Sequence, residues 1–415
     1  MRGILICMLA KLRLLWNSKE IPYGVKVITR ITSIRWFGWG FAETLIPVLL
    51  FSFGSSFAEA GLLKASFDIA FILALPIIGI LADRVRATTL ILVGACLYLF
   101  VGLGYFLAGV TGLVIFIVLA RLINGVSWGL DVVGRETYIM RHAEKNKVAT
   151  VFGYFDTIAN FWWVVAALIG IVLVKYVSIT TLLFLITPFS FLSLLVVLKF
   201  RRHEEKMHIV RHPFSLNLWK EVKGWGLFLK GILGFNFLIA FTGAVVVFFL
   251  PIEVYKEGGS LTPVILMGIA FALPTLTGWS LGKVFDKTGY KSLVTGLVLF
   301  AVLLASLAFM TSLYWKIAIM FAISSILELI SVGSNELIAS STKPEHFGRV
   351  EGVMRSVSSV GEMIGPLTVG ILMDMTSPGH AYVSLSILIF AVAVVIKTVD
   401  RRGFLQRYAV SVKGR

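Results

Sequence analysis

Twelve long apolar runs constrain this chain more than any other feature of its sequence. Each run is about 20 residues long, which is the length that a helix needs to cross the hydrocarbon core of a bilayer. Only helices and closed barrels satisfy every backbone polar group in lipid, and a barrel strand needs only about ten alternating residues. The runs therefore predict an all-α membrane protein. The twelve expected spans are residues 27–52, 58–82, 87–109, 112–140, 148–174, 178–199, 225–252, 262–282, 291–312, 314–341, 348–374 and 378–397.

The composition agrees with this fold class. Of the 415 residues, 58% are hydrophobic and 14% are charged, whereas a soluble domain is about one quarter charged. Cys7 lies before the first span and Cys96 lies within the third, so no disulfide is expected. The apolar start of the chain is too short to span a bilayer and has no small-residue cleavage site. We expect an amphipathic surface helix there rather than a removed leader.

The net charge of +16 is distributed by membrane side. Of the 38 Lys and Arg residues, 28 lie in the two terminal segments and in the loops after even-numbered spans, when the residues at the adjoining span ends are counted with the loops. The opposite loops hold three, Lys175, Lys256 and Lys316, and the other seven lie within spans. Basic residues mark the cytoplasmic side of a membrane protein. We therefore expect a multi-pass protein of the cell membrane with both termini cytoplasmic, and no nucleic-acid partner.

The chain divides into two similar halves. A polar stretch separates the sixth span from the seventh, and each half has a Gly-x-x-x-Asp-Arg/Lys break after its second span, at Gly79–Arg84 and at Gly282–Lys287. Six-plus-six duplications are typical of secondary transporters, whose substrate site lies between the repeats. The expected division is an N-terminal segment 1–26, a six-helix half 27–199, a linker 200–224, a second six-helix half 225–397 and a tail 398–415.

The whole chain resembles the major facilitator superfamily of transporters. The loop signature of that family, G-x-L-x-D-R-x-G-R-K, begins here as Gly79-x-Leu81-x-Asp83-Arg84 and then departs from the pattern at residues 86–87. The other matching positions are Gly282, Asp286, Lys287, Gly289 and Lys291 in the second copy, Arg121 and Gly125 of the R-x-x-x-G signature, and Pro47 in span 1. A Gly-Pro motif similar to that of antiporters lies in span 11, where the family has it in span 5. The subfamily therefore stays unassigned.

The resemblance implies a role for the two loop breaks. In facilitator-type folds span 2 packs beside span 11, and span 5 beside span 8. Asp83 would then face the N-terminus of span 11 and Asp286 that of span 5, where the helix dipole favours an anion by about 0.3–1 kcal/mol. Such contacts would hold a cytoplasmic gate shut, whereas the alternative is a solvated turn. The gate residues expected are Gly79, Asp83, Arg84, Gly282, Asp286 and Lys287, with an inner network of Asp131, Arg135, Asp156 and Arg355.

Charged residues inside spans indicate where coupling takes place, because such residues usually face a cavity or a partner. Glu43 and Arg121 each lie about nine residues from the outer end of their span, so both are about 13 Å deep and can meet. Proton coupling needs a carboxylate that takes up and releases a proton beside a cation. We expect Glu43, Arg121 and Glu328 to serve it, and the alternative is a permanently paired structural bridge.

Tryptophan and asparagine side chains supply candidates for a substrate cavity. Several Trp residues lie toward the middle of spans rather than in the interfacial belts, where Trp is usual. Aromatic rings suit a hydrophobic or cationic solute, although helix packing explains them equally well. The cavity candidates are Trp36, Asn124, Trp128, Asn160, Trp163, Asn236 and Asn335.

These features together predict a secondary active transporter that works by alternating access and exports a hydrophobic or cationic compound in exchange for protons. An uptake symporter or a uniporter for a sugar or another small metabolite stays open. A polytopic membrane enzyme or a sensor is a remote alternative, because no catalytic cluster and no phosphate-binding loop is found. The expected partners are a small solute, protons or another coupling ion, and the bilayer. We expect a monomer without metal or cofactor.

Overall fold

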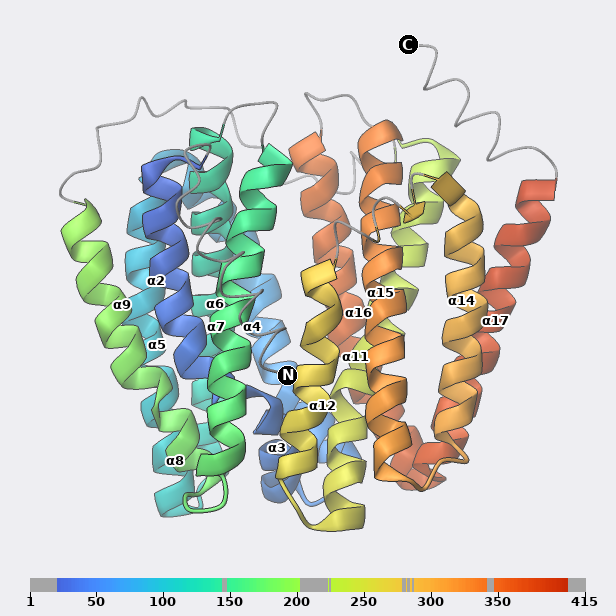
Figure 1. The fold of residues 1–415 in the computed structure, drawn as a ribbon, viewed down its shortest axis with the longest axis horizontal. Helices are drawn as coiled ribbons and strands as arrows, with labels where there is room; N and C mark the ends of the chain where they lie inside the picture. The colour runs from blue at the N-terminus through green and yellow to red at the C-terminus, as the bar shows by residue number, and fades with distance from the viewer. Residues whose placement is uncertain are drawn as a thin grey trace, which may run out of the picture. The chain divides into compact units, whose positions relative to one another are not determined.

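The computed structural model describes residues 21–143, 148–201, 223, 225–277, 281, 284–285, 287–341 and 347–401, and this part of the chain is helical throughout its regular structure (Figure 1). The elements are α2 (Tyr23–Gly40), η1 (Glu43–Leu45), α3 (Ile46–Gly54), α4 (Phe57–Arg84), α5 (Ala87–Thr111), α6 (Val114–His142), α7 (Val148–Leu173), α8 (Ile179–Phe184), α9 (Ile186–Arg201), α11 (Leu227–Gly258), α12 (Thr262–Ala272), η2 (Leu273–Thr277), α14 (Tyr290–Leu307), α15 (Leu313–Ser341), α16 (Phe347–Met375) and α17 (Pro378–Arg401).

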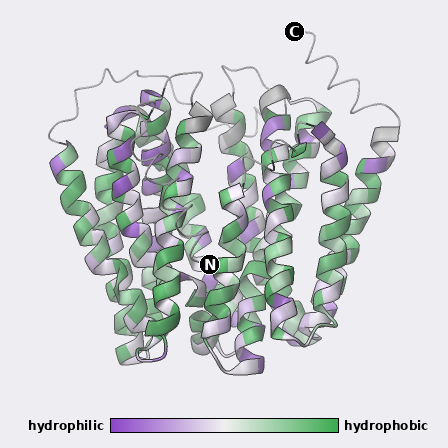
Figure 2. Cartoon of the chain, viewed as in Figure 1, coloured by the Kyte–Doolittle hydropathy of each residue, from purple (hydrophilic) through white to green (hydrophobic). Residues whose placement is uncertain are grey.

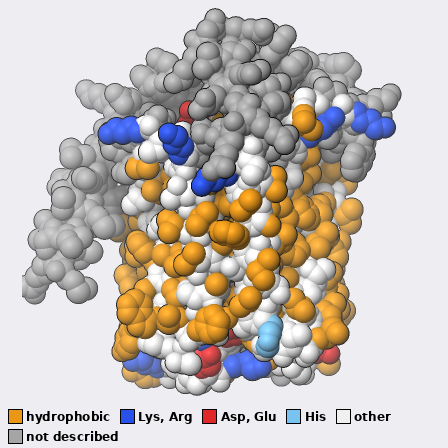
Figure 3. All heavy atoms as spheres, turned by 90° about the vertical axis from the view of Figure 1, so that its right-hand side faces the viewer, with side chains coloured by type: hydrophobic (Ala, Val, Ile, Leu, Met, Phe, Trp, Pro, Cys, Tyr) orange, Lys and Arg blue, Asp and Glu red, His pale blue; other side chains and the backbone are white. Residues whose placement is uncertain are grey.

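The helices confirm the predicted fold class. Within the described residues, nine helices are long and apolar enough to cross a membrane, or ten if the bent pair Tyr23–Gly40 and Glu43–Gly54 is one span. Two shorter apolar helices, Thr262–Thr277 and Lys291–Leu307, lie where the sequence predicts spans 8 and 9. Hydrophobic residues dominate the helices in Figure 2, and Figure 3 shows a broad apolar surface with charged side chains at its two ends. A bilayer would cover that surface.

The residues group into two compact units. One contains Met1–Glu43 and Ile69–Phe214, and the other contains Thr44–Asp68 and Ser215–Arg415. Residues 44–68 belong to the first half by sequence, yet they pack with the helices of the second half. The division of the chain into the five predicted segments remains a prediction.

Prolines place the breaks within spans 1, 6 and 8. A proline lacks the N–H for a helical hydrogen bond, and its ring clashes with the carbonyl group four residues earlier. Pro47 acts on Glu43, so the α-helix gives way to the 3-10 turn Glu43–Leu45 and the two parts of span 1 meet at 42°. Pro188 acts in the same way on Phe184 at the end of α8, and Pro274 lies in the 3-10 turn Leu273–Thr277 that follows α12.

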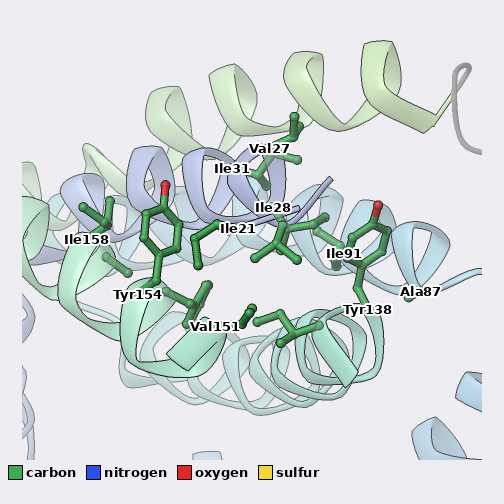
Figure 4. Close-up of a cluster of buried hydrophobic side chains, with 14 of the residues drawn as sticks. Ile21, Val27, Ile28, Ile31, Ala87, Ile91, Tyr138, Val151, Tyr154 and Ile158 are labelled. Carbon is green, nitrogen blue, oxygen red and sulfur yellow. The ribbon is translucent and has the colours of Figure 1, made fainter. Parts of the chain in front are cut away.

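The first unit has its core around α2. Buried side chains of α2, α5, α6, α7 and α9 meet there, among them Ile28, Ile31, Tyr138 and Tyr154 (Figure 4). The backbones of α2 and α7 approach closely, because a Cβ atom added at Gly40 would lie 2.4 Å from the carbonyl oxygen of Trp163. This close approach brings the break in span 1 against α7.

The second unit repeats this arrangement with α11 and α16. A Cβ atom added at Gly361 would lie 2.6 Å from the carbonyl oxygen of Phe237, and one added at Gly365 would lie 2.4 Å from that of Phe241. The glycines of the span 11 Gly-Pro motif therefore seat α16 directly on the backbone of α11. Pro366 lies inside α16 without ending it.

Candidate functional site

The break in span 1 positions the carboxylate of Glu43. The 3-10 turn begins at Glu43, directly after the close approach of α2 to α7. From α7, the indole Nε1 of Trp163 donates a hydrogen bond of 2.6 Å to Glu43 Oε2. The side chain of Glu43 is exposed. Discontinuous membrane helices commonly form the substrate and coupling-ion sites of transporters.

Arg121 of α6 supplies the neighbouring cation. It lies within electrostatic reach of both Glu43 and the buried Tyr105 of α5. Arg121 is 7% exposed and Asn124, one turn further along α6, is 5% exposed. The structure therefore brings together Glu43, Arg121, Asn124 and Trp163, which the sequence places on three different spans. Their functional roles remain predictions.

A second charged cluster lies deeper along α6. Asp131 is fully buried and binds two guanidinium groups, those of Arg35 in α2 and Arg135 in α6. The distance from Arg135 Nη1 to Asp131 Oδ2 is 3.0 Å. The predicted pairing of Asp131 with Arg135 is thus present, and Arg35 joins it. Asp156 of α7 is exposed and lies within electrostatic reach of Arg135.

Aromatic rings surround the guanidinium group of Arg135. Its central carbon lies 5.2 Å from the ring centroids of Trp36 and Trp128 and 5.1 Å from that of Phe155. The rings of Trp36 and Trp128 stack at 6.2 Å. We call Trp36, Trp128 and Phe155 the aromatic cage. Trp36 and Trp128, two of the three tryptophans expected to line a substrate cavity, thus lie beside a cation of the protein itself. Their role in a cavity remains a prediction.

The remaining cavity candidates are spread over both units. Asn160 bonds the carbonyl oxygen of Asp156 at 2.9 Å and so supports its own helix. Asn236 of α11 accepts a hydrogen bond of 2.7 Å from Ser334 Oγ of α15 and contacts Met354 of α16, so it joins three helices of the second unit. On α15, Asn335 is exposed. Glu328 of the same helix is partly buried and has an interaction partner.

The gate residues are described only in part. Gly282 and Asp286 lie outside the described residues, as does the side chain of Asp83. The side chains of Arg84, Lys287 and Arg355 are exposed, and Gly79 has open space around it. The predicted cytoplasmic contacts of Asp83 and Asp286 therefore remain predictions.

Sequence reasoning missed a charged pair in span 2. Lys64 Nζ lies 2.7 Å from Asp68 Oδ2, and Asp68 is 4% exposed. Lys64 also donates a hydrogen bond of 2.9 Å to the backbone carbonyl oxygen of Glu362 in α16. Glu362 lies within electrostatic reach of Lys64, Asp68 and Arg355. The signal was available, because an acid and a base four residues apart inside an apolar run form a pair on one helix face.

Two further contacts of the second unit were also missed. The Tyr382 hydroxyl of α17 donates to the carboxylate of Glu253 in α11, and both residues are buried. Lys316 bonds both oxygens of Glu257 at 2.6 Å. Lys316, which the charge count groups with the outer loops, lies in the first turn of α15 and is 2% exposed. These bonds join the ends of α11, α15 and α17.

Sequence comparison gives a consistent relationship. A sequence model described as Major Facilitator Superfamily matches residues 31–334 and 281–404. The quinolone resistance protein NorA of Staphylococcus aureus is 22% identical over 389 residues, which are 89% of this chain and 95% of that protein. The uncharacterized MFS-type transporter MJ1560 of Methanocaldococcus jannaschii is 20% identical over 378 residues, which are 88% of this chain and 94% of that protein.

Solved structures share the fold. The crystal structure of the nucleoside transporter NupG superimposes with a TM-score of 0.71 at 14% identity and covers 91% of this chain and 99% of that chain. A bacterial homologue of the human lysosomal transporter Spinster, in an inward-facing and unoccupied conformation, gives a TM-score of 0.70 at 14% identity, with coverages of 92% and 97%. At this identity the likeness establishes the fold.

Proposed function

The chain belongs to the major facilitator superfamily, and from that membership we propose that it exports a hydrophobic or cationic compound in exchange for protons by alternating access. The proposal places the protein in the cell membrane as a monomer with both termini in the cytoplasm. The charge bias of the loops supports this orientation. The relative named for quinolone resistance, at 22% identity, supports export over uptake.

The observation that carries the coupling proposal is the setting of Glu43. This carboxylate lies at the break in span 1, accepts a hydrogen bond from Trp163 and has the guanidinium group of Arg121 within electrostatic reach. A carboxylate inside a membrane protein marks an ion or proton pathway by default. Proton uptake by Glu43 would cancel its attraction to Arg121, and rearrangement of the broken span would follow. Glu328 of α15 is the second candidate in the other unit.

Reconstituted protein tests the proposal directly. Liposomes that enclose a pH-sensitive dye would be screened with a panel of solutes, with and without a pH gradient. We expect solute-dependent proton flux that Glu43→Gln abolishes, because glutamine keeps the side-chain shape but cannot exchange a proton. Glu328→Gln, run in parallel, shows whether the second carboxylate carries protons instead.

A matched control separates coupling from a general loss of charge. Glu59 is an exposed carboxylate in the first turn of α4, so Glu59→Gln removes one acid without touching the Glu43 site. We expect it to leave proton flux unchanged. Solute flux that ignores the gradient and both test variants would overturn proton coupling, and the protein would then be a uniporter or would use another ion. Inward accumulation of a sugar or metabolite would reverse the proposed direction.

A further inference from the structure

The first turn of α4 receives its hydrogen bonds from two sources. The N–H groups at the start of a helix have no partner within the helix. Ser56 Oγ accepts from the N–H of Glu59 at 3.1 Å, which is a local cap. The N–H groups of Phe57 and Ala58 instead donate to Asp374 Oδ1 and Oδ2, at 3.0 and 2.8 Å. One carboxylate thus satisfies two N–H groups where the helix dipole favours an anion.

The capping carboxylate comes from the other half of the sequence. Asp374 is the penultimate residue of α16 and lies in the same compact unit as the first turns of α4. The two helices run antiparallel in close contact behind it. A Cβ atom added at Gly370 would lie 2.7 Å from the carbonyl oxygen of Phe57, and one added at Gly61 would lie 2.6 Å from that of Pro366.

The contact continues one turn deeper through the bond from Lys64 Nζ to the carbonyl oxygen of Glu362. Residues 57, 61 and 64 of span 2 therefore meet residues 374, 366 and 362 of span 11 in register. By the predicted orientation this is the outer end of both spans. The halves of an alternating-access transporter must separate there when it opens outward.

We propose that Asp374 is an outer latch that holds spans 2 and 11 together while the transporter is closed to the outside. The inference rests on the proposed alternating-access mechanism and adds a residue that determines when the outer side opens. Opening would release the carboxylate and two N–H groups into water, which solvates both. The contact is therefore reversible, unlike a buried ion pair, whose separation leaves uncompensated charge.

The latch is the counterpart of the predicted cytoplasmic contact. At the inner end the sequence predicts that Asp83, near the C-terminus of α4, faces the N-terminus of α16. At the outer end Asp374, near the C-terminus of α16, caps the N-terminus of α4. By this prediction the antiparallel pair would have an acid at each end for the helix start of its partner. Alternating access would engage one contact at a time.

The rate at which a buried cysteine is labelled reports how often spans 2 and 11 separate, and the measurement needs no transported solute. Ala60 lies on the same face of α4 as Lys64 and is fully buried. The full-length protein, with Cys7→Ser, Cys96→Ser and Ala60→Cys, would be placed in nanodiscs and treated with a bulky maleimide. We expect Asp374→Ala to raise the labelling rate between about threefold and thirtyfold, as loss of a helix cap that biases two states should.

Two controls distinguish a latch from a simple cap. Ser56→Ala removes the local cap of the same helix, and Glu59→Ala removes one exposed acid from the same turn. Neither breaks the contact with α16, so we expect little change in labelling. Equal acceleration by Ser56→Ala, or no acceleration by Asp374→Ala, would overturn the proposal.

Further variants keep the test decisive. Asp374→Asn retains the volume and one acceptor, so we expect a smaller acceleration in the same direction if Asp374→Ala does not fold. Asp83→Asn should slow labelling, because it weakens the contact that favours the outward-open state, and faster labelling would contradict the paired arrangement. Since labelling needs no solute, its result does not depend on whether transport is coupled to protons.

Discussion

Asp131 is a fully buried acid of the first unit that has two cationic partners. Its two oxygens face the guanidinium groups of Arg35 and Arg135, and the side chain is fully buried. Replacement of such a group leaves its partners charged and buried, which costs far more than the pair contributes by its mere presence. Asp131 therefore stabilises the first unit through the cations that it neutralises.

We expect Asp131→Asn to lower the free energy of unfolding by about 3–5 kcal/mol, because two buried guanidinium groups lose their counter-charge. Unfolding of the purified protein in a detergent and denaturant titration measures this change. Arg84→Gln provides the control, since Arg84 is exposed and its substitution should change stability by less than about 0.5 kcal/mol. An Asp131→Asn protein as stable as the wild type would show that the guanidinium groups have other counter-charges.

Glycine residues allow two pairs of helices to pack backbone against backbone. Gly40 lets α2 rest on the backbone of α7, and Gly361 and Gly365 let α16 rest on α11. Small residues at helix contacts are the usual solution inside a membrane, where close packing replaces the hydrophobic effect between helices. The Gly-Pro motif of span 11 has a packing role of this kind, whatever its role in transport.

Gly40→Ala should lower the free energy of unfolding by about 1–3 kcal/mol, because the new Cβ atom would overlap the carbonyl oxygen of Trp163 and force α2 from α7. Gly153→Ala in α7 is the matched control. No atom lies within 4 Å of its added Cβ, so the substitution should be neutral or stabilise the helix by about 0.5–1 kcal/mol. Thermal unfolding of both variants in the same detergent makes the comparison. Equal stability of the two would show that α2 shifts without cost.

Element positions were predictable, but the contacts of particular side chains were less so. An apolar run of 20 residues predicts a membrane span by its length alone. The equal depth of Glu43 and Arg121 in their spans predicted that the two residues can meet. The aromatic cage was not predictable, because sequence periodicity places Trp36 and Trp128 on faces without showing what lies between them. The partners of Arg35 and Asp374 come from distant spans, so no local sequence pattern predicts them.

The distribution of basic residues predicts how the whole molecule is oriented in the membrane. The terminal segments and the loops after even-numbered spans, with the adjoining span ends, hold 28 of the 38 basic residues, which predicts a cytoplasmic C-terminus. A green fluorescent protein fused after residue 415 should therefore fluoresce, and alkaline phosphatase fused at the same place should be inactive. The reverse pattern would overturn the orientation. It would also exchange the inner and outer sides assigned to Asp83 and Asp374.

The aromatic cage has a consequence for the choice of solute. Its rings already hold Arg135, which is anchored to the same helix as Trp128 and to Asp131. An organic cation that used these rings would compete with a ligand tethered within the same chain, whose effective concentration is about millimolar or higher. Competition of this kind would lower the affinity of the aromatic cage for every cationic solute by a similar factor. A site built in this way favours modest affinity over a broad range of compounds rather than tight selection of one.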